Sequence, residues 1–421
     1  MAKRILLVHN RYQQAGGEDA VVANEKALLA AHGYETRLWS VSNDEIRGLG
    51  KTLMTAWQST YSYGSRRRMR EIVAAFGPDL VHVHNFFPLL SPSIYDSCAE
   101  SGVPVVQSLH NYRIICPGGL LMRDGRPCED CIDGTPYQAA LHGCYRGSRL
   151  GSLAVARMVR VHQCNCTWNS KVDRFIALSE FARGRFVAAG LPAERIAVKP
   201  NFAEDRRVSG PVTRAGALYV GRLSPEKGIA TLLRAWSTLE VPLRVIGDGP
   251  LAGAVVAASG GRIASLGFQS GLRVAEEMAG AAFMVLPSQC YENFPLTIAE
   301  AFCQGLPVIA SRIGALEELV EDGVTGLHFT PGNAADLRAK VSWAHEHPEV
   351  LIHMGREARA RYLARYSPEV NFRIMTEIYD SILSKAALGV RNRRASPLTV
   401  NEPDPSVRGS SQARIADEGS P

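Results

Sequence analysis

Residues 217–228 read Ala-Leu-Tyr-Val-Gly-Arg-Leu-Ser-Pro-Glu-Lys-Gly. Four apolar residues typical of a buried strand are followed by a turn that holds a glycine at each end, and a helical pattern starts near Pro225. In parallel α/β sheets, ligands bind beyond the carboxyl ends of the strands. The stretch therefore predicts a strand, a ligand-binding turn and a helix, which is the unit from which open α/β sheets are built.

Apolar strands alternate with helical patterns along nearly the whole chain. Strands are predicted at residues 5–9, 35–39, 80–84, 104–109, 175–178 and 196–199, and again at 217–220, 243–246, 263–266, 283–286 and 308–310. After the first strand, a helix is predicted from Asp19, as its N-cap, to Gly33. This alternation predicts an α/β fold with parallel sheets covered by helices on both faces.

The chain divides into two domains. With 421 residues, 46% of them hydrophobic, it can bury two cores of ordinary size. Residues 201–215 lose apolar periodicity and have the composition of a linker. We therefore predict Rossmann-like domains at 1–205 and 213–365, and a disordered tail at 386–421, where the sequence becomes polar and rich in turn residues.

The charge balance is mildly basic. Lys and Arg outnumber Asp and Glu by 47 to 41, and the resulting charge of +6 suits phosphates or an anionic membrane face but is too small to indicate nucleic acid. The apolar stretch at residues 5–8 is far shorter than the core of a signal peptide, and no other segment is long and apolar enough to span a bilayer. We expect a cytoplasmic protein whose nine cysteines stay reduced.

The first turn of the second domain has the features of a phosphate site. Gly221 lets the backbone turn closely, Arg222 can bind a phosphate with two N–H groups, and Lys227 adds a second cation beside a helix start. The competing interpretation of this short segment is a solvated turn with two cations.

A second turn, residues 287–296, leads into a helix predicted at 297–304. Its backbone N–H groups and the positive end of the helix form a natural anion site. Glu292 precedes this helix and Glu300 lies within it, and carboxylates beside an anion are costly unless hydroxyls, such as those of sugars, donate to them. Taken singly, Glu292 is better explained as an ordinary capping residue and Glu300 as a solvated helical residue.

In this order and at this separation, the two turns resemble those of the family-four retaining glycosyltransferases. The resemblance covers residues 5 to about 383 and implies the GT-B fold, in which two Rossmann-like domains face each other across a cleft. It implies that Arg222 and Lys227 bind the donor diphosphate, while Glu300 binds the ribose and Glu292 the donor sugar. It also implies a C-terminal helix at 366–385 that crosses back to the first domain. The other donor-site residues that it implies are Gly16, Gly17, Gly221, Asp248, Gly249, Gly267, Phe268, Asn293, Phe294 and Leu296.

The fourth strand of the first domain ends in a polar pair, His110 and Asn111, where function is more frequent than packing. By the same resemblance, His110 contacts the donor sugar. No residue pair has the pattern of a nucleophile and its base, which suits a front-face mechanism in which the leaving phosphate accepts the proton of the acceptor. We expect transfer with retention from a UDP- or GDP-sugar to a sugar or lipid-linked acceptor, in polysaccharide or glycolipid assembly, with no cofactor required for catalysis.

Other functions remain as alternatives. A nucleotide-sugar epimerase or a catalytically inactive nucleotide-sugar-binding protein would share the fold, whereas a phosphorylase would need a cofactor lysine site that the sequence does not show. Residues 247–253 imitate a dinucleotide fingerprint, but no acidic residue closes a following strand about 20 residues on. A nicotinamide-dependent oxidoreductase is therefore disfavoured.

Two basic and apolar segments predict peripheral contact with the anionic inner membrane face. The alternative is that these cations lie on the solvated faces of ordinary helices. The first segment has Arg66, Arg67, Arg68 and Arg70 before Ile72, Val73 and Phe76, and the second combines Arg146, Arg149, Arg157 and Arg160 with Leu150, Leu153, Val155, Met158 and Val159.

Four cysteines predict a structural zinc site in the first domain. Cys128 and Cys131 have the two-residue spacing that lets two thiolates reach one ion, and Cys116 and Cys144 flank them at similar distances. The segment between the outer cysteines is rich in turn residues and poor in core residues, so it needs a staple. Unliganded thiols and disulfides are the alternatives.

Overall fold

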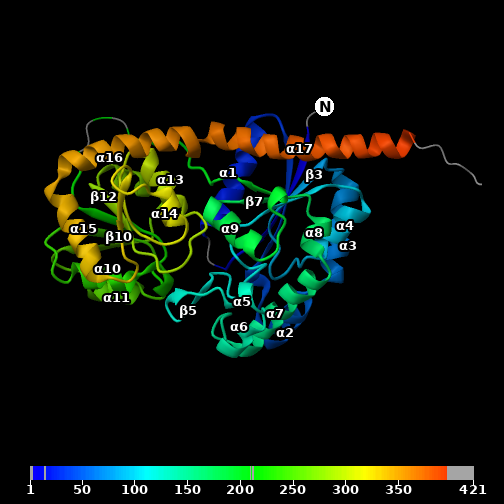
Figure 1. Cartoon of the computed structure of the whole chain (residues 1–421), viewed down its shortest axis with the longest axis horizontal. Coiled ribbons are helices and arrows are strands. Elements are labelled where there is room, and N and C mark those ends of the chain that lie inside the picture. Colours follow the sequence, from blue (N-terminus) through cyan, green and yellow to red (C-terminus); the bar gives the residue numbers. More distant parts are fainter. Residues whose placement is uncertain (1–2, 14–15, 209, 211–212, 396–421) are drawn as a thin grey trace, which may run out of the picture. The chain divides into compact units, whose positions relative to one another are not determined.

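Two six-stranded parallel sheets with helices around them make up the fold (Figure 1). The computed structural model describes residues 3–13, 16–208, 210 and 213–395, with the backbone alone for residues 385–395. Both sheets belong to one compact unit that ends at Leu383, and the residues from Ser384 onward form a second unit. The predicted α/β class with two Rossmann-like sheets is confirmed.

The first sheet has the strand order β2-β1-β3-β4-β7-β8. Its strands are β1 (Arg4–Arg11), β2 (Glu35–Ser42), β3 (Leu80–Asn85), β4 (Val105–Ser108), β7 (Arg174–Ala177) and β8 (Ile196–Val198). Successive side chains of a strand point to opposite faces, so Ile5 and Leu7 enter one buried cluster while Leu6 and Val8 enter another. Both faces of the sheet are therefore buried, as expected for parallel strands.

The helices of this part precede, follow and cover these strands. They are α1 (Gly17–Ala31), η1 (Asn43–Glu45), α2 (Gly48–Gln58), α3 (Tyr63–Phe76), α4 (Ile94–Glu100), α5 (Asp130–Asp133), α6 (Gln138–His142), α7 (Arg149–Cys164), α8 (Thr167–Lys171), α9 (Glu180–Ala188) and η2 (Ala193–Arg195). A two-stranded antiparallel hairpin, β5 (Met122–Arg123) and β6 (Arg126–Pro127), lies in the cysteine-containing insertion.

The second sheet has the order β11-β10-β9-β12-β13-β14. Its strands are β9 (Ala217–Val220), β10 (Leu243–Ile246), β11 (Ile263–Gly267), β12 (Phe283–Leu286), β13 (Val308–Ser311) and β14 (Gly326–Phe329). The helices are η3 (Pro225–Lys227), α10 (Ile229–Trp236), α11 (Ala252–Ala257), α12 (Gly271–Ala279), α13 (Leu296–Cys303), α14 (Ala315–Leu319), α15 (Ala334–Glu346), α16 (Pro348–Arg361), η4 (Tyr362–Tyr366) and α17 (Pro368–Ala395).

Three local details differ from the sequence-based expectation. Asp19 is the third residue of α1 and not its N-cap, because Gly16 takes the cap position and its N–H donates to Asp19 Oδ2 at 3.0 Å. The segment from Pro225 is a short 3₁₀ turn, and the α-helix begins only at Ile229. Strand β14 was not predicted, because its four residues lack a distinctive pattern.

Helix α17 packs against the first sheet. Its Tyr379 hydroxyl lies 2.7 Å from His82 Nδ1, and Asp380 pairs with Lys3. The helix continues to Ala395, so residues 386–395 are helical where the sequence predicted a disordered tail, and residues 396–421 lie outside the described part. The chain thus returns to its first sheet after completing the second.

The prediction that α3 presents a membrane-binding face is wrong, and Val155, Met158 and Val159 of the second predicted membrane segment, in α7, are likewise buried in the core. Ile72 and Val73 are buried in the core of the first sheet, and so is the neighbouring Met69. The arginines of α3 instead form ion pairs, those of Arg66 and Arg70 with Glu100. These residues do form a helix, but the apolar side of the helix faces the protein interior.

Candidate functional site

The candidate site lies at the topological switch point of the second sheet. The connection from β9 leads to β10 on one side, while β12 pairs with β9 on the other side. In open α/β sheets such a point leaves a crevice at the carboxyl ends of the strands, where ligands bind. The two turns singled out from the sequence, residues 221–228 and 287–295, follow β9 and β12 and meet here.

Glycines allow these turns to pack against each other. Gly228 has φ +73°, and a Cβ at this position would lie 1.8 Å from the carbonyl oxygen of Pro287. A Cβ on Gly247 would lie 1.9 Å from the oxygen of Gly221. Both distances are far inside van der Waals contact, so only glycine fits without a backbone shift.

A salt bridge joins the two turns. Lys227 Nζ donates to Glu292 Oε1 at 2.6 Å, and Ser288 Oγ donates to the same oxygen at 2.7 Å. Burial alone would lower the pKa of Lys227, but the adjacent Glu292 carboxylate raises it above its ordinary value. The pair is thus a cation and an anion held together between the two turns, a contact that the sequence did not predict.

Two exposed polar side chains, those of Arg222 and Asp248, lie in the connections that follow β9 and β10. Arg222 is exposed, and its carbonyl accepts a hydrogen bond from the Tyr219 hydroxyl at 2.9 Å, which holds the turn while leaving the guanidinium unconstrained. Asp248 is also exposed, and its Oδ1 accepts from the N–H of Gly249 at 2.7 Å. These groups can contact a bound anion or sugar without loss of protein contacts.

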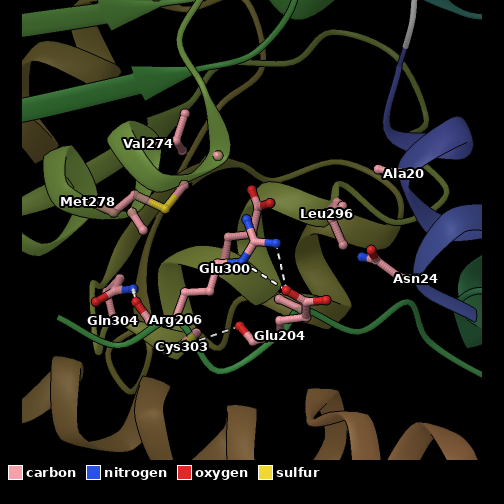
Figure 2. A pocket seen from close by; sticks show the side chains of 13 residues that line it. Ala20, Asn24, Glu204, Arg206, Val274, Met278, Leu296, Glu300, Cys303 and Gln304 are labelled. Carbon is pink, nitrogen blue, oxygen red and sulfur yellow. Dashed lines mark hydrogen bonds and ion pairs between the residues drawn. The ribbon is translucent and has the colours of Figure 1, made fainter. Parts of the chain in front are cut away.

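A pocket next to this site contains Glu300 (Figure 2). It is lined by Ala20 and Asn24 of α1, by Ala203, Glu204 and Arg206 of the connection between the sheets, by Gly271, Val274, Ala275 and Met278 of α12, and by Leu296, Glu300, Cys303 and Gln304 of α13 and its end. Burial raises the pKa of Glu300, and Arg206 opposes this effect. A carboxylate in such a pocket gains from hydroxyl donors, so a ribose or sugar fits its chemistry.

The other predicted donor-site residues divide into exposed and buried groups. Phe268 follows β11 and has 80% of its surface exposed, so its ring can stack on a planar ligand. Phe294 is buried in the core, and its carbonyl accepts from Asn201 Nδ2 at 3.5 Å. The side chain of Phe294 is therefore not available to a ligand, and only its backbone could contact one.

The first sheet contributes His110, just beyond the end of β4. Its neighbour Leu109 accepts a hydrogen bond at its carbonyl from Asn293 Nδ2 at 3.4 Å, so the turn that carries Glu292 reaches this strand end. Burial lowers the pKa of His110 to about 3, so its ring is neutral near pH 7. The structure thus brings the end of β4 close to the turn after β12, and the sequence predicts site residues at both places.

Gly16 and Gly17 form the start of α1. Among the described residues, no atom lies within 4 Å of a Cβ placed on either glycine. Packing against the described residues therefore does not require glycine here, and the lack of side chains leaves the backbone open to close approach by a ligand.

Polar residues behind His110 and beside Gly17 were not singled out from the sequence. Glu18 lies next to Asp19, and burial raises the pKa of Glu18 to about 8. His84 lies 3.0 Å from His110. The signal is present in β3, where the polar residues His82, His84 and Asn85 occur in a fully buried strand.

The four cysteines of the insertion gather loosely. Cys116 is buried and the other three are partly exposed, and all are free thiols. Burial and the proximity of the other three cysteines raise the pKa of Cys131 to about 12. Within the described residues, no three of the four sulfur atoms lie within 4.8 Å of one another, so a shared ion would require them to move closer.

Comparisons with known proteins agree with this arrangement. The family glycosyl transferases group 1 matches residues 214–347, and glycosyltransferase family 4 matches residues 15–207. A glycogen synthase of Mycobacterium tuberculosis is 31% identical over 413 residues, which cover 89% of this chain and 94% of that protein. The chain belongs to the group 1 glycosyltransferases.

Other similarities are more distant or shorter. An uncharacterized glycosyltransferase of Methanocaldococcus jannaschii is 36% identical over 128 residues, and the match spans 30% of this chain and 36% of that protein. The structure of Anabaena HepE in complex with UDP aligns with a TM-score of 0.64 and 19% identity, covering 90% of this chain and all of that one. The glycosyltransferase has the GT-B fold, as the two turns predicted. Among its described residues, no helix has both the length and the apolar character needed to cross a membrane.

Proposed function

We propose that this glycosyltransferase moves a sugar from a nucleotide-sugar to an acceptor hydroxyl with retention of anomeric configuration. The observation that carries the proposal is the contact between Lys227 and Glu292 at the switch point of the second sheet, next to the pocket of Glu300. A fixed cation suits a diphosphate, and the two carboxylates suit the hydroxyls of a sugar and a ribose.

Donor binding then uses groups from three turns. Arg222 and Lys227 neutralise the diphosphate together with the backbone N–H groups at the start of α13. Glu300 accepts hydrogen bonds from the ribose, and the exposed ring of Phe268 lies near the base. Solved structures of HepE contain UDP and UDP-glucose. This supports a UDP- or GDP-sugar as donor here.

The reaction needs no protein nucleophile. The bond between the anomeric carbon and the leaving phosphate oxygen breaks, and the acceptor oxygen forms its bond to that carbon on the same face. The acceptor's proton passes to the departing phosphate oxygen. Fixed cations stabilise the charge that develops on the diphosphate, so catalysis is mainly positioning and electrostatics.

A thermal-shift panel with UDP, GDP, ADP and their sugars tests donor binding. A ligand at 100 times its dissociation constant stabilises the folded protein by about 2.7 kcal/mol. Donor hydrolysis in the same panel separates an enzyme from an inactive binding protein, and sugar inversion without release would reveal an epimerase. Absence of both stabilisation and donor consumption across the panel would contradict the proposal.

A surface of the first domain supports a lipid-linked acceptor at an anionic membrane face. Leu49, Leu53 and Trp57 of α2 are 85%, 71% and 70% exposed, and Leu150 of α7 is 79% exposed. Helices α2 and α6 both contact α7. We call the exposed side of α2, α6 and α7 the apolar-basic face.

The charge of this face complements an anionic surface. Residues 48–58, 138–142 and 149–164 contain no Asp or Glu, and they include Lys51, Arg149, Arg157 and Arg160. The guanidinium of Arg157 lies 4.2 Å from the ring centre of Trp57, so cation and apolar groups share one surface. Each cation near an anionic lipid surface contributes about 1 kcal/mol, which makes binding dependent on salt. Such an acceptor fits glycolipid or polysaccharide assembly.

A further inference from the structure

A chain of buried polar side chains extends from His110 into the protein. His84 Nδ1 lies 3.0 Å from His110 Nε2, and His84 Nε2 lies 3.7 Å from Glu25 Oε2. The other oxygen of Glu25 accepts a hydrogen bond from Lys199 Nζ at 2.6 Å. Lys199 also donates to Asn371 Oδ1 of α17 at 3.2 Å. The chain thus joins α1, β3, the end of β4, the end of β8 and α17.

These groups are withdrawn from solvent. The side chains of Lys199 and His84 are 0% exposed, and that of Glu25 is 1% exposed. A buried ion pair is poor evidence for stability, since apolar residues of similar volume would serve as well or better. Its place behind a half-buried histidine at the candidate site therefore favours a role in positioning.

The contacts determine where the protons lie. Burial would raise the pKa of Glu25, but the Lys199 ammonium holds it below its ordinary value, so Glu25 is an anion. Glu25 Oε2 lies 3.7 Å from His84 Nε2 and 3.9 Å from His82 Nδ1, and among the described residues neither this oxygen nor His84 Nε2 has a hydrogen-bond partner. A nitrogen lone pair facing an anionic oxygen would be repelled, whereas an N–H would be attracted. The proton of His84 is therefore on Nε2.

The same logic extends to His110. Burial lowers the pKa of His84 well below its ordinary value, so this ring is neutral and its Nδ1 carries a lone pair. The 3.0 Å contact between His84 Nδ1 and His110 Nε2 needs one proton between the two nitrogens, and only His110 can supply it. Among the described residues, Nδ1 of His110 has no hydrogen-bond partner.

We infer that Glu25, acting through His84, holds His110 as the tautomer protonated at Nε2, so that its Nδ1 accepts a hydrogen bond from a hydroxyl of the donor sugar. The part of this inference that concerns the sugar rests on the proposed function, whereas the tautomer does not. Glu25 and His84 are positioning residues because neither reaches the ligand. The consequence is specificity, because a donor sugar without a hydroxyl at this position leaves the acceptor nitrogen unpaired.

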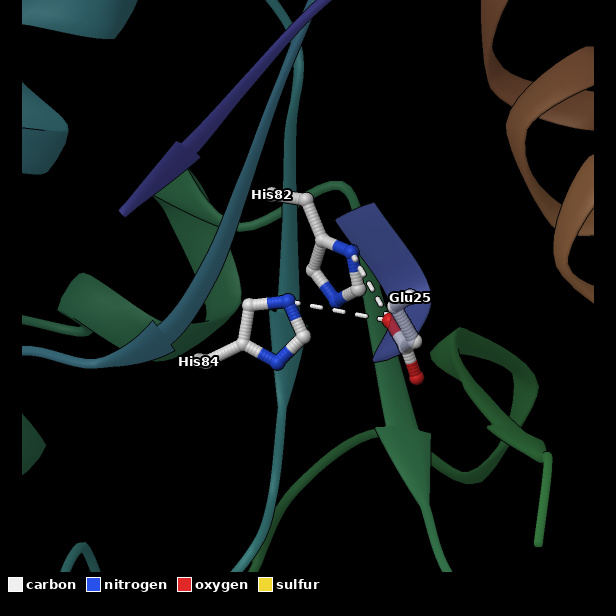
Figure 3. Close-up of side chains that lie close together, drawn as sticks. All are labelled: Glu25, His82 and His84. Carbon is white, nitrogen blue, oxygen red and sulfur yellow. Dashed lines mark ion pairs between the residues drawn. The ribbon is translucent and has the colours of Figure 1, made fainter. Parts of the chain in front are cut away.

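A metal ion at the same place is the main alternative. Glu25, His82 and His84 offer three ligand atoms that all lie within 4.8 Å of one another (Figure 3). However, His82 Nδ1 already contacts the Tyr379 hydroxyl at 2.7 Å, and the Lys199 ammonium already neutralises the carboxylate. A divalent cation bound to His82 Nδ1 would have to displace the Tyr379 hydroxyl and would add positive charge beside the Lys199 ammonium, so the arrangement of polar contacts without a metal is favoured.

Nitrogen-15 spectra of the imidazole rings in the full-length protein test the tautomer. His162 is an internal reference in the same domain, because its Nε2 must donate to the carbonyl of Thr60 at 2.8 Å. We expect His110, assigned by its loss in His110→Gln, to match His162 between pH 6 and 8, with Nε2 protonated and Nδ1 bare. Protonation of His110 at Nδ1, or one metal ion per chain in elemental analysis with the His84 ring bound to it, would overturn the inference.

Glu25→Gln tests the coupling. Its amide oxygen can still accept from Lys199 while its NH₂ donates to His84 Nε2, so the contact at His84 Nε2 and the contact between His84 Nδ1 and His110 Nε2 both reverse direction. We expect His110 to become protonated at Nδ1, His162 to stay unchanged, and kcat/KM for the donor to fall about ten- to a hundredfold. An unchanged His110 tautomer in folded Glu25→Gln would contradict the coupling.

The tautomer and the proposed function can still be judged separately if one of these experiments fails. If Glu25→Gln does not fold, the wild-type spectrum alone decides the tautomer. If no nucleotide-sugar is consumed by the wild-type enzyme, the proposed function fails while the tautomer result stands. If a donor is consumed but His110 is protonated at Nδ1, the inference fails and the proposed function survives.

Discussion

Lys227 and Glu292 are 65 positions apart in the chain, yet the ammonium of one lies 2.6 Å from the carboxylate of the other. They follow β9 and β12, which become neighbours only when the second sheet forms with its reversed strand order. The charged pair therefore exists only in the assembled sheet, where the turns that carry it are held together by glycines. Formation of the site thus depends on formation of the second sheet.

Gly228→Ala should destabilise the protein strongly. The added Cβ would clash with the carbonyl of Pro287, and φ +73° is unfavourable for alanine, which together cost at least about 2 kcal/mol. Gly253→Ala is the matched control, because no atom lies within 4 Å of its Cβ in α11, and it should be neutral or stabilising by up to about 1 kcal/mol. Equal melting temperatures for the two variants would show that the turns are not packed as described.

Liposome sedimentation tests the apolar-basic face. Binding to anionic vesicles should be strong at low salt, weak at high salt and absent with neutral vesicles, because cations provide much of the attraction. Replacing Leu53 with Ser and Trp57 with Ala should weaken it at least tenfold. Trp343→Ala, at a partly exposed tryptophan of α15, should bind as the wild type does. Recovery of the wild type in the supernatant with both kinds of vesicle would exclude the membrane contact.

The proposed structural zinc has a direct chemical test. Protein purified without added metal should contain about one zinc per chain, and chelation should lower its melting temperature. Cys128→Ser should lose the metal while nucleotide affinity stays nearly unchanged, since a closed four-thiolate shell has no position for substrate. Cys164→Ser, at an exposed cysteine outside the cluster, is the control. Four titratable thiols and no zinc would contradict the predicted zinc site.

The raised pKa of Glu18 predicts a pH-dependent difference in stability. Its pKa is about 8 in the folded protein, compared with an ordinary value of 4.5, so its contribution to stability is present below pH 4.5 and is lost as the pH rises through 8. The uncharged side chain of Glu18→Gln avoids this loss. Its melting temperature should therefore rise relative to the wild type between pH 5 and 8. Glu240→Gln, at an exposed position, should show no such trend, and parallel curves for Glu18→Gln and the wild type would rule out the shift.

The sheets could be predicted because their strands are short apolar runs. The predicted strands at 217–220, 243–246 and 283–286 have the observed bounds. Helix caps were less predictable, since Asp19 is as suitable at the third helical position as at the cap.

Side-chain relationships across the fold could not be predicted in the same way. Glu25, His84, His110 and Lys199 come from four separate segments, and no local pattern indicates that they meet. Periodicity also does not show what the apolar face of a helix contacts. Such a face packs against a protein core as readily as it binds a membrane. For this reason the membrane prediction for α3 is wrong, and the sequence pattern does not identify the exposed leucines of α2.

Donor consumption by Arg222→Ala and Lys227→Ala tests the central claim most directly. Both variants should fold and should consume the nucleotide-sugar about a hundredfold more slowly than the wild type, because each lacks a cation that stabilises the departing diphosphate. Arg262→Ala breaks an exposed ion pair with Glu240 in the same domain and should keep the wild-type rate. Wild-type turnover in both Arg222→Ala and Lys227→Ala would contradict the assignment of the donor site to the switch point of the second sheet.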